Sequence, residues 1–320
     1  MDCAAVQHGT TIEHYFGGFM QAEVLSGPLS LDGRFESSLS RRLFHIARPS
    51  VEKIIGLPQM NTVYEQACAI THARSFFHAI LQVLQTSVQI VDGSPESIPE
   101  HGSVVVVSNH PFGCIEGIAL GAVLLDRRPD VRLMANYLLG RIPELREHFF
   151  LVDPFGGSQA ARANLRPMKD SLRWLKNGGL LGIFPAGEVA HYSPQTRNVE
   201  ECAWNSSVAR LVVSGGATIV PVWFDGSNGL AFQSLGMLHP RFRTAMLARE
   251  FLRMREKTLK MRIGSPIAAE HLAKLGSDAD ITDYLRTRTL MLGANETTTT
   301  VLPRRAAAVV LPCKPRLLHE

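Results

Sequence analysis

Two residues of the sequence have the types and the spacing for acid–base chemistry: His110 and Glu116, with five residues between them. His110 closely follows four consecutive valines, Val104 to Val107, which are typical of a buried strand, and Ile115 is the expected start of the next helix. A histidine at the carboxyl end of a strand, followed by an acid on the next helix, lies where α/β proteins place their active sites.

If the chain reverses between these two residues, the carboxylate of Glu116 reaches back to the ring of His110. Such a carboxylate fixes the tautomer of the imidazole and raises its basicity, so the ring can take a proton from a hydroxyl group. The spacing therefore predicts that His110 is a general base oriented by Glu116. The alternative interpretation is a histidine that fills a turn and a glutamate that stabilises a helix N-terminus.

Three further apolar runs are each followed by a turn rich in proline and glycine. They are Val152-Asp153-Pro154-Phe155-Gly156-Gly157, Gly182-Ile183-Phe184-Pro185-Ala186-Gly187-Glu188 and Ile219-Val220-Pro221-Val222-Trp223-Phe224-Asp225-Gly226. Backbone N–H groups near Gly113 or Gly187 could hold an oxyanion. Pro221, inside an apolar run, predicts an edge strand or a bulge. Four strand ends of the same kind predict one shared crevice.

The composition is that of a globular protein with a large core: 320 residues, 45% of them hydrophobic and 19% charged. The net charge of +4 comes without a dense Lys/Arg block, so we expect no nucleic-acid partner, whereas contact with anionic lipid remains compatible. Five scattered cysteines without a C-x-x-C pair predict neither a disulfide framework nor a structural zinc site.

The N-terminus has no signal-peptide pattern, and no apolar run reaches the roughly 18 residues that a spanning helix requires. We therefore expect a cytoplasmic protein with at most peripheral contact to the inner face of the membrane.

Near-continuous Val/Ile/Leu strands that alternate with helices predict an α/β fold with a mostly parallel central sheet flanked by helices, preceded by an N-terminal helical segment. The expected divisions are a poorly ordered segment 1–40, a helical segment 41–87, an α/β domain 88–292 and a flexible tail 293–320. Strands are expected at 88–91, 103–107, 131–135, 149–152, 180–184, 218–224 and 259–263. Helices are expected from near Ser50 (after Pro49) and at 61–86 (capped by Asn61), 115–125, 157–176, 205–214 and 278–292.

The segments NHPFGCIEG, VDPFGG, IFPAGEVA and IVPVWFDG, in this order, resemble the four blocks of the glycerolipid acyltransferase superfamily. The resemblance extends from about Leu43 to Leu292 and is nearest to the bacterial haemolysin-like group, which includes lyso-ornithine-lipid acyltransferases. It implies transfer of an acyl group from acyl-CoA or acyl carrier protein to the hydroxyl of a lysolipid, without a further cofactor or metal. His110 would be the base, and Glu116 would orient it.

The resemblance also implies a set of substrate-binding residues at the four blocks. They are Asn109, Pro111, Phe112, Gly113, Asp153, Phe155, Gly156, Phe184, Pro185, Gly187, Glu188 and Pro221.

The sequence departs from the usual superfamily pattern in three places. The first block usually has His, four residues and then Asp, whereas here five residues precede Glu116. The usual arginines of the second and third blocks are absent, since Asp153-Pro154 and Glu188-Val189 occupy those positions. Arginine is the natural bidentate partner of phosphate, so an amino-acid lipid is favoured as the acceptor over a phosphorylated one. Arg162 or Arg197 could substitute for the missing arginines.

Other interpretations remain open at this point. The same base could serve a thioester or lipid hydrolase, although the G-x-S-x-G elbow of serine esterases is absent. His110, Glu116 and His191 could bind a metal, but their spacing fits no zinc template. A non-catalytic lipid-binding protein is a third possibility. Cys114 could be an acylated nucleophile, although we favour a role as a small apolar residue.

Overall fold

The structure is a computed structural model that describes residues 29, 31, 38–154, 157–238 and 240–294. The strands are β1 (Ser87–Asp92), β2 (Val104–Ser108), β3 (Val131–Asn136), β4 (Phe149–Val152), β5 (Leu180–Ile183), β6 (His191–Ser193), β7 (Asn198–Glu200), β8 (Thr218–Phe224) and β9 (Thr258–Ile263). The helices are α1 (Ser38–Ile55), α2 (Leu57–Ala69), α3 (Phe76–Leu84), α4 (Ile115–Arg127), α5 (Gly157–Lys176), α6 (Ser207–Gly215), α7 (Leu230–Leu238), α8 (Pro240–Leu252), α9 (Ala269–Leu272) and α10 (Asp278–Ala294). Short 3-10 helices are η1 (Pro95–Ser97), η2 (Tyr137–Arg141) and η3 (Pro143–His148).

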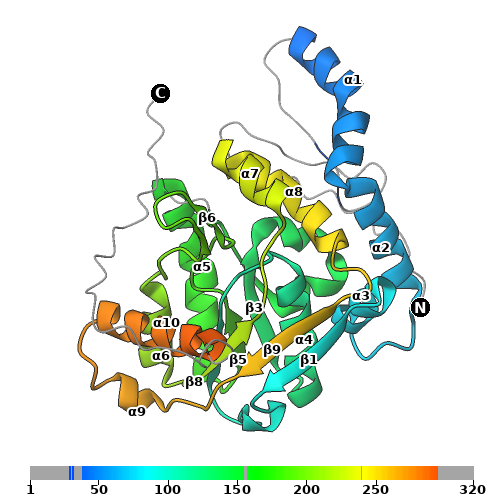
Figure 1. The fold of residues 1–320 in the computed structure, drawn as a ribbon. Coiled ribbons are helices and arrows are strands. Elements are labelled where there is room, and N and C mark those ends of the chain that lie inside the picture. Colours follow the sequence, from blue (N-terminus) through cyan, green and yellow to red (C-terminus); the bar gives the residue numbers. More distant parts are fainter. Residues whose placement is uncertain (1–28, 30, 32–37, 155–156, 239, 295–320) are drawn as a thin grey trace.

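Seven strands form one sheet in the order β1-β9-β8-β2-β5-β3-β4. The five strands from β8 to β4 are parallel, so their carboxyl ends meet at one edge of the sheet. β9 runs antiparallel to β8, and β1 pairs with β9 in parallel. β9 and β1 therefore run opposite to the other five strands (Figure 1). The predicted α/β fold with a mostly parallel sheet is confirmed.

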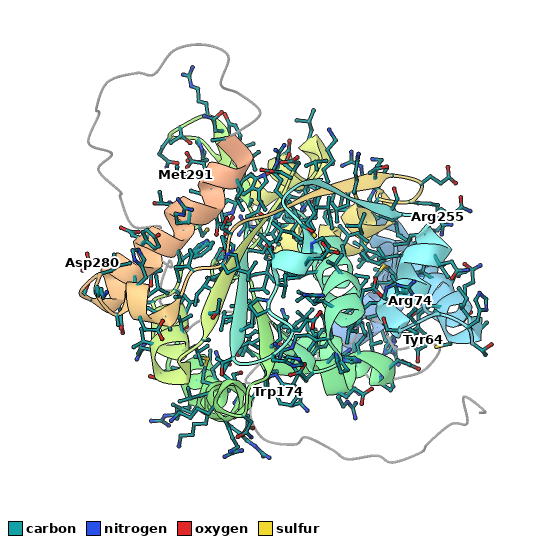
Figure 2. All side chains as sticks on the ribbon, turned by 90° about the horizontal axis from the view of Figure 1, so that it is seen from below. Tyr64, Arg74, Trp174, Arg255, Asp280 and Met291 are labelled. Atoms are coloured by element: carbon teal, nitrogen blue, oxygen red, sulfur yellow. The ribbon has the colours of Figure 1, made fainter. Side chains whose placement is uncertain are left out.

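The four valines of β2 show why the sheet is covered on both faces. Val104 and Val106 pack into one apolar cluster with α3 and α4, whereas Val105 and Val107 pack into a second cluster with α6. Successive strand residues point to opposite faces, so a continuous apolar run requires a core on each side. Figure 2 shows these layers, with Asp280 of α10 on one side of the strands and Tyr64 of α2 on the other.

The N-terminal helices differ from the prediction. Pro49 does not interrupt the first helix but lies inside α1, where an Arg48–Glu52 ion pair of 2.8 Å connects the turns on either side of it. The helix predicted at 61–86 is two helices, because Ile70 takes an extended conformation at the end of α2 and the hydroxyl of Ser75 caps α3. Asn61 is not a cap: its amide lies within α2 and pairs with the backbone of Leu29.

The sheet decides between the two alternatives predicted for Pro221. β8 is a central strand, so Pro221 is not at an edge. The alternative, a bulge, fits the pairing, since Val220 and Pro221 are opposed by the three residues 264–266 of the antiparallel neighbour. The prediction also missed α7, α8, α9 and the β6–β7 hairpin, whose sequences lack a clear apolar period. The tail 295–320 and most of the segment 1–37 lie outside the described residues.

Candidate active site

The candidate site lies where the carboxyl ends of three neighbouring parallel strands meet. β2 lies between β5 and β8, and the chain leaves β2 just before His110. Ligands of open α/β sheets bind at this edge, outside the carboxyl ends of the strands. The first, third and fourth predicted blocks are therefore adjacent in space, whereas the second block, after the edge strand β4, does not join them as the shared-crevice prediction requires.

His110 and Glu116 face one another at this edge. Nδ1 of His110 lies 3.0 Å from Oε1 of Glu116, and 17% of the histidine side chain is exposed while the carboxylate is fully buried. Nδ1 is not aligned for a straight hydrogen bond to this oxygen, so the contact is a close approach of the ring to the carboxylate. Because Nδ1 faces the carboxylate, Nε2 is the ring nitrogen that can act on a substrate.

The carboxylate of Glu116 is fixed by the turn that precedes α4. Its Oε1 accepts hydrogen bonds from the backbone N–H of Phe112 at 2.8 Å and of Gly113 at 2.7 Å. Oε2 is buried without a hydrogen-bond partner among the described residues. Burial by itself would raise the pKa of Glu116, but the contact with His110 and the two N–H donors outweigh it and hold the pKa below its usual range. The positive end of α4 favours the same ionised form.

Gly113 makes this turn possible. Its φ is +93°, and a Cβ at this position would lie 2.6 Å from side-chain atoms of Val189 and Leu247. A residue with a side chain would be strained in conformation and would also collide with its neighbours. Pro111 and Phe112 on the same turn are buried, and the carbonyl of Phe112 accepts from the amide of Asn228 at 3.1 Å.

Asn109 connects the ends of β2 and β8. Its side-chain amide donates to the carbonyl of Phe224 at 2.9 Å and accepts from the N–H of Phe224 at 2.8 Å. This two-point contact lies in the interior, where an unmade hydrogen bond is costly. Asn109 was predicted to bind substrate; its observed contacts are those of a residue that positions the strand ends beside His110.

The third predicted block encloses the other side of the histidine. The ring of Phe184 lies 4.6 Å from the ring of His110, centroid to centroid, at an angle of 31°. The turn over Pro185 and Gly187 then brings the chain back, and the N–H of Ala190 donates to the carbonyl of His110 at 2.9 Å. The imidazole is thus held between an aromatic ring and a buried carboxylate.

Sequence reasoning missed a second acid beside the histidine. Oε2 of Glu201 accepts from the backbone N–H of His110 at 3.3 Å, and Oε1 accepts from the indole of Trp204 at 2.6 Å. Burial raises the pKa of Glu201, although its contacts with Trp204 and His110 act in the opposite direction. Glu201 follows a strand of three residues that has no apolar pattern, so no local signal marked it.

Sequence reasoning also missed Arg243, which brings a guanidinium to the third block. Its Nη2 lies 3.1 Å from Oε2 of Glu188, and only 13% of the arginine side chain is exposed. The side chains named as substitutes for the missing arginines, Arg162 and Arg197, are exposed on α5 and on the β6–β7 turn. Because Arg243 comes from α8, far along the chain, spacing could not identify it.

The second predicted block lies farther from the histidine. β4 is three strands away from β2, and the backbone of Asp153 pairs with the side chain of Asn164 on α5. Phe155 and Gly156 lie outside the described residues. Pro221 is buried in β8 beside Val107, before the end of the strand.

The predicted oxyanion donors are already used in this structure. The N–H of Gly113 donates to Glu116, and the N–H of Gly187 donates to the carbonyl of Phe184 at 3.0 Å.

The alternative role of Cys114 as an acylated nucleophile is not supported by its surroundings. Burial and the charge of Glu116 raise the pKa of Cys114 to about 12. A thiol that stays protonated is a weak nucleophile, which supports the apolar role favoured for Cys114.

The metal alternative is not supported by the arrangement of the ligand atoms. Within the described part of the chain, Glu188, His191 and Cys202 come together, rather than His110, Glu116 and His191. The guanidinium of Arg243 lies against Glu188 in this cluster, and like charge disfavours a cation there.

A histidine beside a buried carboxylate at the open ends of parallel strands is an arrangement typical of α/β enzymes that use general base catalysis. Residues 34–298 match the model of a family described as acyltransferase, and the chain belongs to this acyltransferase family. The predicted family and the predicted enzyme class are confirmed. Among the described residues, no helix is both long and apolar enough to cross a membrane.

Two curated relatives carry the name lyso-glycine lipid O-acyltransferase. The protein from Phocaeicola vulgatus is 27% identical over 218 residues, covering 66% of this chain and 75% of the relative. The protein from Bacteroides thetaiotaomicron is 27% identical over 223 residues, covering 66% of this chain and 77% of the relative. A solved structure, the 1-acyl-sn-glycerophosphate acyltransferase PlsC from Thermotoga maritima, matches with a TM-score of 0.42 at 14% identity, covering 82% of this chain and 97% of that one.

Proposed function

We propose that the protein is a lysolipid O-acyltransferase that moves a fatty acyl group from a thioester donor to a hydroxyl of the acceptor lipid. The observation that carries this proposal is the contact of His110 with the buried carboxylate of Glu116. This arrangement supports a base that acts on a hydroxyl and needs no cofactor. The names of the two curated relatives support the same reaction class.

The reaction follows from the geometry of the pair. Nε2 of His110 takes the proton of the acceptor hydroxyl while the hydroxyl oxygen attacks the thioester carbonyl carbon, and a C–O bond forms. The ionised Glu116 stabilises the imidazolium that results. The tetrahedral intermediate then expels the thiolate as the C–S bond breaks, and the imidazolium returns its proton to the medium or to the sulfur. The donor is acyl carrier protein or CoA, both of which present a thioester.

Removal of the base tests the mechanism. We expect His110→Ala to lower kcat by at least about a thousandfold and Glu116→Gln by about a hundredfold, because general base catalysis contributes factors of this size. His101→Ala, which changes an exposed histidine, is the matched control and should keep full activity. The measurement is transfer of a radiolabelled acyl group from acyl carrier protein or CoA to a lysolipid.

Two results would overturn this proposal. One is a His110→Ala protein with unchanged transfer. The other is release of free fatty acid at the same rate with and without the lysolipid, which would identify a hydrolase instead.

For the acceptor, we propose an amino acid that is acylated on its nitrogen and carries a hydroxyl on its acyl chain; lyso-glycine and lyso-ornithine lipids are of this kind. Such a molecule keeps a free carboxylate. Arg243 supports this choice, because its guanidinium is largely buried while its partner Glu188 is 53% exposed. The carboxylate of an acceptor could therefore replace Glu188 against a guanidinium that is already in place.

A substitution at this position tests the acceptor. We expect Arg243→Gln to raise the KM for a carboxylate-bearing lysolipid at least tenfold with less than a threefold change in kcat, because a charge-assisted contact is lost. Arg249→Gln, on the same helix but exposed, is the control. The methyl ester of the acceptor should show the raised KM already with the unmodified protein, and equal KM values for acid and ester would contradict the assignment.

We further propose that the protein meets its acceptor at the inner face of the cytoplasmic membrane, as a peripheral protein. Exposed apolar side chains on α1, α7 and α8 support this, including Ile46 at 77% and Leu230 at 86% exposure. α1 lies alongside α8, which packs against α7 (Figure 1). Arg41 and Arg42 at the start of α1 are exposed and suit anionic lipid.

Charged substitutions test this surface. We expect the unmodified protein to sediment with vesicles of anionic phospholipid, and Ile46→Asp/Ile54→Asp/Leu230→Asp to remain largely in the supernatant. Val199→Asp places the same charge on an exposed apolar position of β7 and should bind as the unmodified protein does. Equal sedimentation of the triple variant would contradict a membrane contact through these helices.

A further inference from the structure

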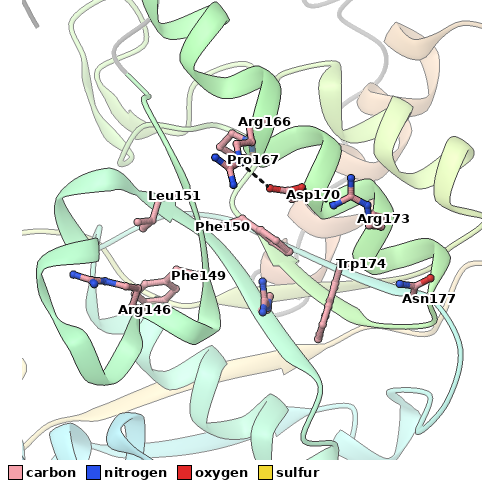
Figure 3. Close-up of a pocket in the computed structure, with 11 residues that line it drawn as sticks. Arg146, Phe149, Phe150, Leu151, Arg166, Pro167, Asp170, Arg173, Trp174 and Asn177 are labelled. Carbon is pink, nitrogen blue, oxygen red and sulfur yellow. Dashed lines mark hydrogen bonds and ion pairs between the residues drawn. The ribbon is translucent and has the colours of Figure 1, made fainter. Parts of the chain in front are cut away.

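A cavity lies away from His110, beside β4, the edge strand of the sheet (Figure 3). Its volume is about 530 Å³. The lining side chains come mainly from β4 and from the second half of α5, with Arg146 contributed by η3. Figure 3 shows Phe150 of β4 on the side of Arg166, Asp170 and Arg173 of α5, whereas Phe149 and Leu151 belong to the opposite face of the sheet.

The groove is strongly basic. Four arginines line it (Arg132, Arg146, Arg166 and Arg173), against one carboxylate, so its lining carries three more positive charges than negative ones. The carboxylate of Asp170 lies 3.0 Å from the guanidinium of Arg173 and 3.7 Å from that of Arg166, so it forms ion pairs with both arginines of α5. An excess of this size in one groove favours an anionic partner.

The arginines fall into two pairs with different contacts. The guanidinium of Arg132 lies over the rings of Phe150 and Trp174, 4.9 Å and 4.6 Å from their centroids, and Arg146 donates two hydrogen bonds to the carbonyl of Gly140. In contrast, the side chains of Arg166 and Arg173 are 92% and 73% exposed. Arg132 and Arg146 are held by these contacts on one side of the groove, and Arg166 and Arg173 extend from α5 on the other, so the four charges form a surface for an extended ligand.

The contacts distinguish between the possible anions. A free nucleotide, such as the adenosine part of CoA, would need an aromatic face for its base, but Arg132 covers Trp174 and the ring packs tightly against Gly179. A membrane would need several inserted apolar side chains, and next to the groove Leu165 of α5 is a single one, whereas the exposed apolar side chains gather on α1 and α7. Guanidiniums that project from a helix fit carboxylates on the surface of another protein.

We propose that this groove docks an acidic acyl carrier protein that presents the acyl thioester on a phosphopantetheine arm; the proposal rests on the acyltransferase function proposed above. β4 is three strands from β2, a lateral distance of roughly 14 Å at the usual strand spacing. The groove reaches the carboxyl edge of the sheet at its Arg166 end, because Asn164, two residues earlier on α5, contacts the backbone of Asp153 just after β4. The arm can enter at that end and run along the carboxyl edge toward His110. The groove thereby selects the carrier protein over CoA as the donor.

Donor kinetics test the proposal. Arg166→Glu/Arg173→Glu reverses the two exposed charges, and Arg210→Glu on α6 is the matched control, since its side chain is 67% exposed. With saturating lysolipid, we expect the double variant to raise the KM for acyl carrier protein at least tenfold with kcat within twofold, and the control to change neither. The rise in KM should occur with acyl carrier protein and not with acyl-CoA as the donor. It should be smaller in the milder variant Arg166→Gln/Arg173→Gln, which removes the two charges without reversing them. The KM of the unmodified protein for this donor should rise with salt.

Three outcomes would overturn carrier docking at this groove. One is an unchanged KM for the carrier donor in the double variant, and a second is an equal rise for acyl carrier protein and acyl-CoA, which would indicate a site for the phosphate that both share. A third is transfer by the unmodified protein from acyl-CoA alone, which would leave the acyltransferase function intact. Transfer from neither thioester would instead reject the proposed function itself.

Discussion

The structure of the site depends on one buried carboxylate. Glu116 is removed from solvent, and a buried charge is tolerated only when it is paired and hydrogen-bonded. One oxygen, Oε1, receives the N–H groups of Phe112 and Gly113 together with the approach of the His110 ring. The turn that supplies these donors requires the positive φ of Gly113 and its lack of a side chain. The loop, the helix start and the base are therefore one unit.

This unit explains how the first block departs from the usual pattern of its superfamily. Five residues separate His110 from Glu116, and the glutamate side chain reaches back from the first turn of α4 to all three partners. The surrounding strands then fix the unit in place, because Asn109 joins the end of β2 to β8 while Phe184, after β5, packs against the imidazole.

The sequence was informative where the chemistry is local. His110 and Glu116 are six positions apart on one strand–turn–helix segment, and the buried valines before them determine the sheet position. Glu201 and Arg243 could not be found in this way, since they reach the site from distant segments without a recognisable pattern. The fold class followed from the apolar strands, whereas α7 and α8 carry no clear period. Pro49 misled because tertiary packing tolerates a proline inside a helix, whereas Pro221 correctly indicated an irregular pairing, a bulge in place of an edge.

The central claim is that Glu116 keeps the proton of the neutral His110 ring on Nδ1 and leaves Nε2 free as the base. Nitrogen-15 NMR of the ring, with histidine labelled and the signal assigned by His110→Gln, measures this directly. The account predicts a neutral ring protonated at Nδ1 in the unmodified protein, and a mixture of tautomers in Glu116→Gln. A ring protonated at Nε2 in the unmodified protein, or the same spectrum in both proteins, would contradict it.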